Sequence, residues 1–135
     1  MIYSKEALIF DSRNQEHEKI EDLAIARFKH LSIECQGSIY VIGGLGEKDN
    51  MPMKTCEAFD VKLSPEWRRC SSMFIERSEF HGCTHPDSDL IYVFGGTLRP
   101  EEKHIIERYD SKEDKWDVIS VRLPDTFPFF DIFYT

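Results

Sequence analysis

Two seven-residue stretches of the chain are nearly identical, and they constrain its fold more than any other feature. Residues 38–44 read SIYVIGG, and residues 90–96, which begin 52 positions later, read LIYVFGG. Each stretch is a short apolar run, rich in β-branched and aromatic residues, that ends in a glycine pair. Such a run predicts a strand covered on both faces, and the glycines permit positive φ angles or close backbone packing. We therefore tested whether the two stretches belong to two copies of one structural unit.

The similarity continues beyond the glycine pairs in the same order. In the first copy the block Glu57–Asp60 (EAFD) precedes Trp67. In the second copy the block Glu107–Asp110 (ERYD) precedes Trp116. The offset between copies is 50 for the acid-aromatic block and 49 for the tryptophans, so the drift is small. It falls in the segments between expected strands, where changes of length are tolerated.

The repeat also extends towards the N-terminus. Arg27 in ARFKH and Arg77 in ERSEFH hold matching positions ahead of the glycine pairs. A third, partial copy begins near Phe10, because LIFDS matches the aromatic-Asp step of the other copies at an offset of 49. No tryptophan follows it near His17, so this first copy is half a unit and a degenerate one.

Each full unit contains four segments with the composition of strands, within about fifty residues, which is the pattern of a propeller blade. The blocks Gly-Gly, Glu-x-aromatic-Asp, Trp and Arg-x-x-His/Phe resemble those of the kelch repeat. The resemblance implies an all-β fold, a kelch-type β-propeller segment of four-stranded antiparallel blades. The expected divisions are the second half of a degenerate blade (1–24), two kelch repeats (25–74 and 75–123), and the start of a further blade or a closing strand (124–135).

One local pattern conflicts with this interpretation. Ile20, Leu23, Phe28 and Leu31 lie near helical spacing, so the window read alone favours an amphipathic helix. The repeat predicts a strand, a turn and another strand there. We prefer the repeat, because consistency over a long range outweighs a local window.

The resemblance assigns a structural role in the blades to ten repeat residues. They are Gly43, Gly44, Phe59, Asp60, Trp67, Gly95, Gly96, Tyr109, Asp110 and Trp116. The aromatic members, with Tyr40 and Tyr92, are expected to pack in the blades rather than to bind a ligand, because a buried aromatic ring contributes a large apolar area.

Partner contacts are expected from the loops and from the two repeated arginines. Residues 45–55, 71–79 and 97–104 are expected loops, and their sequences differ strongly between copies. The candidate partner-binding residues are Arg27, Arg77, Lys48, Asp49, Arg99 and Glu101. For Arg27 and Arg77 two roles stay open. Each arginine ties strands together within or between blades, or it lines a partner-binding face, as the resemblance to adaptor proteins of the BTB-kelch type implies.

Net charge and hydropathy argue against two classes of partner, and the cysteine pattern indicates the cellular compartment. The formal net charge is −8, from 25 acidic and 17 basic residues, which argues against a nucleic-acid partner. No stretch reaches the roughly 18 apolar residues that a membrane-spanning helix needs, and no targeting segment is recognisable, so we expect no membrane partner. The four cysteines form no C-x-x-C pair, which favours reduced thiols and a cytoplasmic protein over a disulfide framework.

No residue pattern indicates catalysis, a cofactor or a metal. GGLGEK and GGTLRP lack the form of a phosphate-binding loop. Cys83 and His85, with His81 nearby, lack a second pair of ligands for zinc. The residues of the copper centre found in some kelch-type oxidases cannot be placed on this sequence. We therefore expect no catalytic, cofactor-binding or metal-binding residues.

The expected function is a non-catalytic protein–protein interaction module that presents loops to a protein partner. In the kelch family this implies an adaptor that recruits substrates to ubiquitin ligases, or a cytoskeletal binder, although no BTB, BACK or F-box segment is recognisable here. The alternatives are a kelch-propeller enzyme acting on a sugar or small metabolite, and a fragment without independent function. Because a propeller buries its sheet faces by closing its ring, two and a half blades imply either missing blades or a homodimer that closes a ring.

Overall fold

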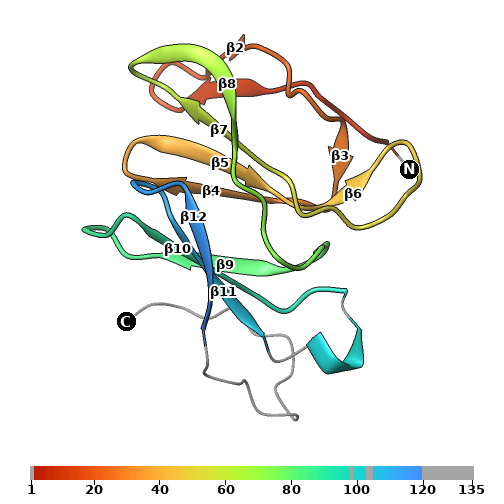
Figure 1. Ribbon diagram of the computed structural model, residues 1–135. Coiled ribbons are helices and arrows are strands. Elements are labelled where there is room, and N and C mark those ends of the chain that lie inside the picture. Colours follow the sequence, from red (N-terminus) through yellow and green to blue (C-terminus); the bar gives the residue numbers. More distant parts are fainter. Residues whose placement is uncertain (1, 98, 103–104, 120–135) are drawn as a thin grey trace.

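The computed structural model describes residues 2–97, 99–102 and 105–119, and these residues form antiparallel β-sheets joined by loops (Figure 1). The first sheet is a hairpin of β1 (Leu8–Asp11) and β2 (Glu16–Lys19). It corresponds to the partial first copy of the repeat, and the side chains of β2 are exposed throughout.

The second sheet is a complete blade of four strands in the order β4-β5-β7-β8. Its strands are β4 (Leu31–Cys35), β5 (Ser38–Ile42), β7 (Cys56–Asp60) and β8 (Ser64–Cys70). β5 is the strand of SIYVIGG, and it pairs with β4 and β7. Four of its five residues are buried, so both faces of the strand are covered, as its continuous apolar run predicted. The register between β7 and β8 shifts between Phe59 and Asp60, where the chain approaches its turn.

The third sheet repeats this arrangement in the order β9-β10-β11-β12. Its strands are β9 (His81–Thr84), β10 (Leu90–Phe94), β11 (Ile106–Asp110) and β12 (Lys115–Ile119). β10 is the strand of LIYVFGG and again occupies an internal position. The prediction of an all-β fold with four-stranded antiparallel blades is therefore confirmed.

Short elements join the blades. β3 (Arg27–Phe28) pairs with β6 (Leu45–Gly46), and a 3-10 helix, η1 (Pro100–Glu102), lies in the β10–β11 connection. Residues 20–31 form no helix, and the window instead runs through an irregular segment into β3 and β4. Of the four apolar residues in this window, Leu23 is buried, and Ile20, Phe28 and Leu31 are partly buried. The repeat predicted this segment better than its local periodicity did.

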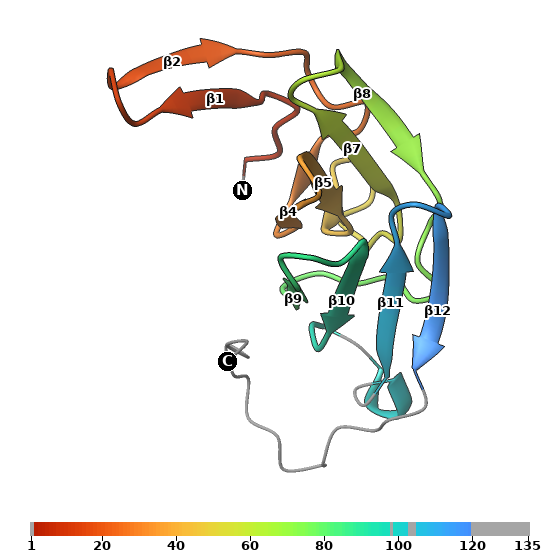
Figure 2. The same cartoon turned by 90° about the vertical axis from the view of Figure 1, so that its left-hand side faces the viewer.

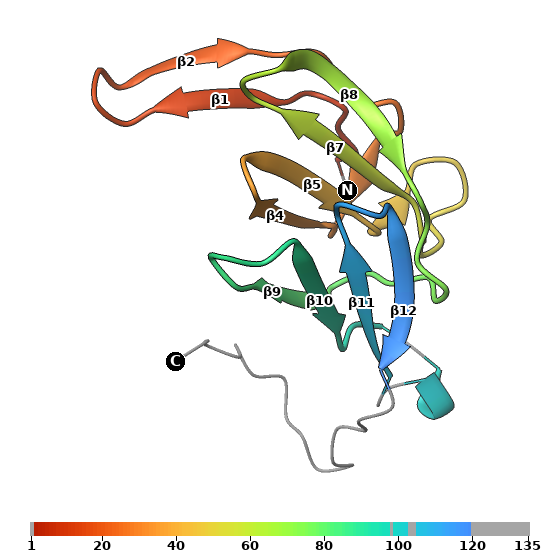
Figure 3. The ribbon, with the colours of Figure 1, turned by 60° about the vertical axis from the view of Figure 1, so that its left-hand side comes forward.

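The three sheets follow one another as an arc, from the β1–β2 hairpin through the second sheet to the third (Figures 2 and 3). The arc is open, because the described strands do not close into a ring. The main core lies between the two complete blades, where β4 packs against β9. The buried side chains of this core include Tyr40, Ile42, Cys56, Ala58, Cys70, Met73, Ile91, Val93, Tyr109 and Trp116.

The second glycine of each pair is required by close packing between successive segments of the chain. Gly44 has a φ of 93°, and a Cβ atom there would lie 2.7 Å from the carbonyl oxygen of Phe28. Gly96 has a φ of 101°, and a Cβ there would lie 2.7 Å from the carbonyl oxygen of Ser78. Both the left-handed conformation and the lack of space exclude other residues.

The repeated aspartates build the hairpin turns. One carboxylate oxygen of Asp60 accepts hydrogen bonds from the amides of Lys62 and Leu63. Asp110 does the same with Lys112 and Glu113, and Asp11 accepts from the amide of Arg13. These bonds explain why the aromatic-Asp step occurs in all three copies.

The strands of the two complete blades lie within the predicted repeats of residues 25–74 and 75–123. The boundaries of those divisions stay predictions. Residues 124–135, predicted to begin a further blade or to form a closing strand, lie outside the described residues.

Candidate protein-interaction face

The long connections of both blades lie along one edge of the arc. Because successive strands of a blade run in opposite directions, every second connection reaches the same end of the sheet. Three long connections therefore share one end of the sheets, which we call the loop edge. They are the loops after the glycine pairs (45–55, and the described residues of 97–105) and the link between the blades (71–80). The tight hairpin turns (12–15, 36–37, 61–63, 85–89 and 111–114) share the opposite end, the turn edge. In Figure 1 the loop edge is on the right and the turn edge is on the left.

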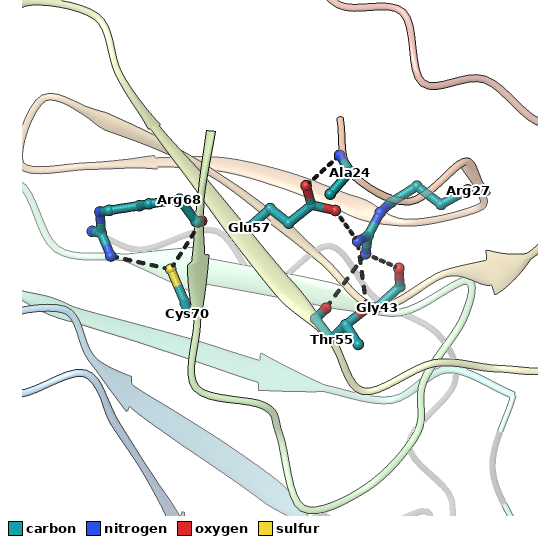
Figure 4. Close-up of polar contacts among 7 residues, drawn as sticks. All are labelled: Ala24, Arg27, Gly43, Thr55, Glu57, Arg68 and Cys70. Carbon is teal, nitrogen blue, oxygen red and sulfur yellow. Dashed lines mark hydrogen bonds and ion pairs between the residues drawn. The ribbon is translucent and has the colours of Figure 1, made fainter. Parts of the chain in front are cut away.

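Arg27 holds the loop edge of the first complete blade together from the inside. Its Nη2 lies 2.6 Å from a carboxylate oxygen of Glu57, and its Nη1 donates a 2.7 Å hydrogen bond to the carbonyl of Gly43 (Figure 4). The second oxygen of Glu57 accepts a 2.8 Å hydrogen bond from the amide of Ala24. The pair thus ties β3, the glycine corner and β7 to the segment that enters the blade.

Arg77 makes the same network one repeat later. Its Nε lies 3.0 Å from Glu107, and its two Nη atoms donate 2.8 Å hydrogen bonds to the carbonyls of Gly95 and Ile105. Glu107 also accepts a 2.6 Å hydrogen bond from the amide of Phe74, which corresponds to the bond that Ala24 makes in the first blade. The repeat in the sequence therefore includes a repeated ion pair.

Both arginine side chains are completely buried, so a partner bound to the surface of the described structure would not contact them. Of the two roles that the sequence leaves open for Arg27 and Arg77, this burial favours the one in which each arginine ties strands together, and partner binding by them stays an untested prediction. Burial lowers the pKa of Arg77 by disfavouring its charged form, and the carboxylate of Glu107 opposes this effect. Glu57 and Glu107 have no assigned role among the sequence predictions. The signal that could have identified them is their constant distance from the arginines, because Glu57 follows Arg27 by 30 positions and Glu107 follows Arg77 by 30.

The other four predicted partner residues are exposed on the loop edge. Lys48 and Asp49 lie in the loop between β6 and β7, and Arg99 and Glu101 lie at η1. Within the described part of the chain, the two pairs belong to separate loops that no hydrogen bond or ion pair between them joins. They are therefore distributed charges rather than one assembled cluster.

Two exposed apolar side chains accompany these charges and were not predicted. Met51 is 59% exposed in the first loop, and Phe74 is 62% exposed in the link between the blades. Exposed aromatic and methionine side chains with charged surroundings are typical of protein–protein interfaces. An apolar residue within an otherwise polar loop, as in EKDNMPM, is the signal that could have identified Met51.

The repeated aromatic residues have packing roles. The indole of Trp116 donates a 2.8 Å hydrogen bond to the carbonyl of Ser71, and that of Trp67 donates one of 2.8 Å to the carbonyl of Glu21. The Tyr109 ring lies 4.9 Å from that of Trp116 and 5.6 Å from that of Tyr40, measured between centroids. Each tryptophan thus fastens the outer strand of its blade to the segment that enters that blade.

Among residues 2–97, 99–102 and 105–119, no group of three or more His, Cys, Asp or Glu side chains could hold a metal ion. Helical segments in this part of the chain lack the length and apolar character needed to cross a membrane.

Comparison with known proteins identifies the repeat. The family model of the Kelch motif matches residues 26–74 and 83–120, which together are more than half of the chain. The chain is 26% identical over 117 residues to Kelch-like protein 38 of Rattus norvegicus and of Mus musculus, covering 84% of this chain and 20% of each relative. It is also 26% identical over 124 residues to Kelch-like protein 25 of Xenopus tropicalis, covering 85% of this chain and 20% of that protein. The chain thus spans about a fifth of the length of these curated relatives.

Proposed function

Because the chain belongs to the kelch-repeat family, we propose that it is a non-catalytic protein–protein interaction module that binds a protein partner through its loop edge. One contrast supports this proposal above all. The strands, glycine corners and arginine–glutamate pairs repeat between the blades, whereas the loops 45–55 and 97–105 share almost no sequence. Residues that the fold does not dictate are available for recognition.

The chemistry of the loop edge fits a protein surface with both charged and apolar groups. Lys48, Asp49, Arg99 and Glu101 supply charges of both signs, which favour specificity and orientation. Met51 and Phe74 supply apolar side chains that a partner can bury. The negative net charge supports a protein rather than a nucleic acid as the partner.

The finer role that we propose is recruitment of a protein substrate, as an adaptor in ubiquitin ligation, in the cytoplasm. This proposal rests on the kelch family and on the position of the loop edge. Binding to the cytoskeleton is the alternative role, and the identity of the captured partner distinguishes the two.

Affinity capture with paired variants tests the proposal. The chain is immobilised, and proteins captured from a cytosolic extract are compared with those captured by the Lys48→Glu/Arg99→Glu variant. The control, Lys62→Glu/Lys112→Glu, makes the same change of charge on the turn edge. We expect the captured amount of at least one partner to fall by at least about tenfold with the first variant and to stay unchanged with the control. A partner that is lost only with the turn-edge variant would overturn the proposal.

We also propose that the open arc is completed by further blades, supplied by a second copy of this chain or by a longer chain. Leu8 and Phe10 on the β1–β2 hairpin are 60% and 63% exposed, although both are large apolar residues. A hairpin is half a blade, and an isolated two-stranded sheet is marginally stable in water. Additional strands next to the hairpin would cover these side chains.

A further inference from the structure

Two buried cysteines face each other across the outer half of the first complete blade. Cys56 on β7 is directly opposite Cys70 on β8 in the strand register. Cys56 is fully buried and Cys70 is 5% exposed, and both belong to the core between the two blades. The Cα atoms of directly opposed residues in antiparallel strands lie about 4.5–5.5 Å apart, which is within the range of about 4.4–6.8 Å that a disulfide spans.

The two thiols have different chemical environments. A hydrogen bond between them is the largest effect on both, and it lowers the pKa of Cys70 to about 7, while burial of the thiol opposes this. The same hydrogen bond and burial raise the pKa of Cys56. A guanidinium nitrogen of Arg68 lies 3.2 Å from the Cys70 sulfur (Figure 4), and this positive charge also favours the thiolate. Cys70 is therefore the more acidic thiol of the two, and Cys56 is the one that keeps its proton.

The other two cysteines lack this arrangement. Burial raises the pKa of both Cys35 and Cys83, so both are thiols at neutral pH. The titratable groups around Cys70 come from several elements: Cys56 on β7, Tyr109 on β11, Asp114 in the β11–β12 turn, and Arg68 on its own strand. Of these, Asp114 opposes the thiolate, whereas Arg68 and Tyr109 favour it.

We propose that Cys56 and Cys70 form a dithiol that hydrogen peroxide converts into a disulfide between β7 and β8. The Cys70 thiolate attacks one peroxide oxygen, the O–O bond breaks, and hydroxide leaves, which yields a sulfenic acid on Cys70. The sulfur of Cys56 then attacks the Cys70 sulfur, the S–O bond breaks, and water leaves with the proton of Cys56. Two thiols and one peroxide thus become one disulfide and two waters, with two electrons transferred from sulfur to oxygen.

The usual spacing of opposed residues in antiparallel strands suits a reversible modification better than a structural crosslink. Opposed Cβ atoms lie about 4.5–5.5 Å apart in an antiparallel pair, whereas a disulfide requires about 3.5–4.5 Å. The strands must therefore approach each other by about 1 Å, and a strained disulfide is readily reduced. The shift would be felt at the neighbouring Ser71, whose carbonyl accepts the hydrogen bond from Trp116 of the next blade.

Peptide mapping of the intact chain tests the proposal. The 135-residue chain is treated with hydrogen peroxide at pH 7, the remaining thiols are alkylated, and the protein is digested with trypsin. We expect the peptides of residues 55–62 and 70–77 to be joined by a disulfide that dithiothreitol cleaves. Disulfides joining other cysteines, or oxidation without any linked peptide, would overturn the proposal.

Three variants separate the two steps. Cys56→Ser should accumulate a sulfenic acid on residue 70 that dimedone traps, and Cys70→Ser should show neither the trapped adduct nor the disulfide. Cys83→Ser is the control and should form the disulfide like the unaltered chain. Dimedone labelling of Cys83 or Cys35 instead of Cys70 in the Cys56→Ser variant contradicts the assignment.

The order of reactivity can be measured without any variant, so a folding defect in a variant does not decide the result. In the unaltered chain, the rate of alkylation of Cys70 should rise with pH to a midpoint near 7. The rates for Cys35 and Cys83 should rise only above the pKa of an ordinary thiol, about 8.5. A midpoint for Cys70 equal to or above theirs would overturn its role as the attacking thiol.

Discussion

At the scale of single residues, the two repeated arginines differ in how completely their guanidinium groups are hydrogen-bonded. Arg77 uses its Nε for Glu107 and its two Nη atoms for backbone carbonyls, whereas the Nε of Arg27 is buried without a hydrogen-bond partner. The desolvation of such a pair is offset only when its hydrogen bonds are complete. The Arg77–Glu107 pair is therefore the better of the two pairs for measuring how much this motif contributes to the free energy of unfolding.

Replacement of Arg77 by Ala should lower the free energy of unfolding by about 3–5 kcal/mol, because it leaves the Glu107 carboxylate buried without its cation. Arg13→Ala is the matched control. Arg13 pairs with Asp11 on the surface, where water and salt screen the pair, so its loss should leave the urea midpoint nearly unchanged. Urea unfolding followed by tryptophan fluorescence measures both. Equal midpoints for the two variants would show that the buried pair has no structural role.

A second prediction concerns the positive charge next to Cys70. Because Arg68 favours the thiolate, Arg68→Gln should raise the pH midpoint of Cys70 alkylation by about one unit. Arg69→Gln is the control, because successive side chains of a strand point to opposite faces. A shift of the same size in both variants would indicate a general effect of net charge instead.

At the scale of elements, the glycine corner after each internal strand fixes how the next segment of chain packs. Gly96 combines a φ of 101° with contact distances that no side chain can meet. Gly37, in the β4–β5 turn, has a φ of 81°, but a Cβ atom there would meet nothing within 4 Å. The two glycines thus separate the conformational requirement from the steric one.

Gly37→Ala should cost about 1–2 kcal/mol of stability, which is the cost of the left-handed conformation for a residue with a Cβ. Gly96→Ala should cost roughly 2–5 kcal/mol, because displacement of the Ser78 backbone is added to that conformational cost. Thermal or urea unfolding of the two variants checks the difference. If both lose the same stability, the close approach at Gly96 is not a constraint.

At the scale of the whole molecule, the open arc leads to a prediction about association. The β1–β2 hairpin exposes Phe10 without further strands beside it in the described structure. If a second copy supplies those strands, light scattering on a size-exclusion column should give twice the mass of the 15.9 kDa chain. Phe10→Asp should then reduce the mass to that of a monomer.

Leu63→Asp is the control for this experiment, because Leu63 is 86% exposed in the β7–β8 turn and does not belong to the hairpin. It should leave the mass unchanged. A folded monomer of the unaltered chain would exclude the homodimer. Missing blades from a longer chain would then be the remaining proposal.

The class of fold and the kind of repeating unit can be predicted from the amino-acid sequence alone. Two copies of an apolar run, a glycine pair, an aromatic-Asp step and a tryptophan can be satisfied by one local geometry, so their spacing predicted the blades and their strands. For residues 20–31 the repeat gave the correct prediction and the helical periodicity gave the wrong one. The repeat reflects packing between distant segments of the chain, whereas the periodicity of a short window reflects only which local residues are apolar. The exposed loop residues, such as Lys48 and Arg99, could be predicted as well, since loops fall on the surface.

The positions of the long polar side chains follow from the three-dimensional fold and not from the sequence pattern. An arginine that precedes a strand ending in a glycine pair can either contact a partner at the surface or form a buried ion pair. Which of the two occurs depends on whether a carboxylate from another strand lies within reach of its guanidinium group. Glu57 and Glu107 do so, 30 positions further along the chain. The same holds for Cys56 and Cys70, which are 14 positions apart in sequence and become opposite only through the register of β7 and β8. Contacts of this kind depend on register and burial, which composition and spacing do not specify.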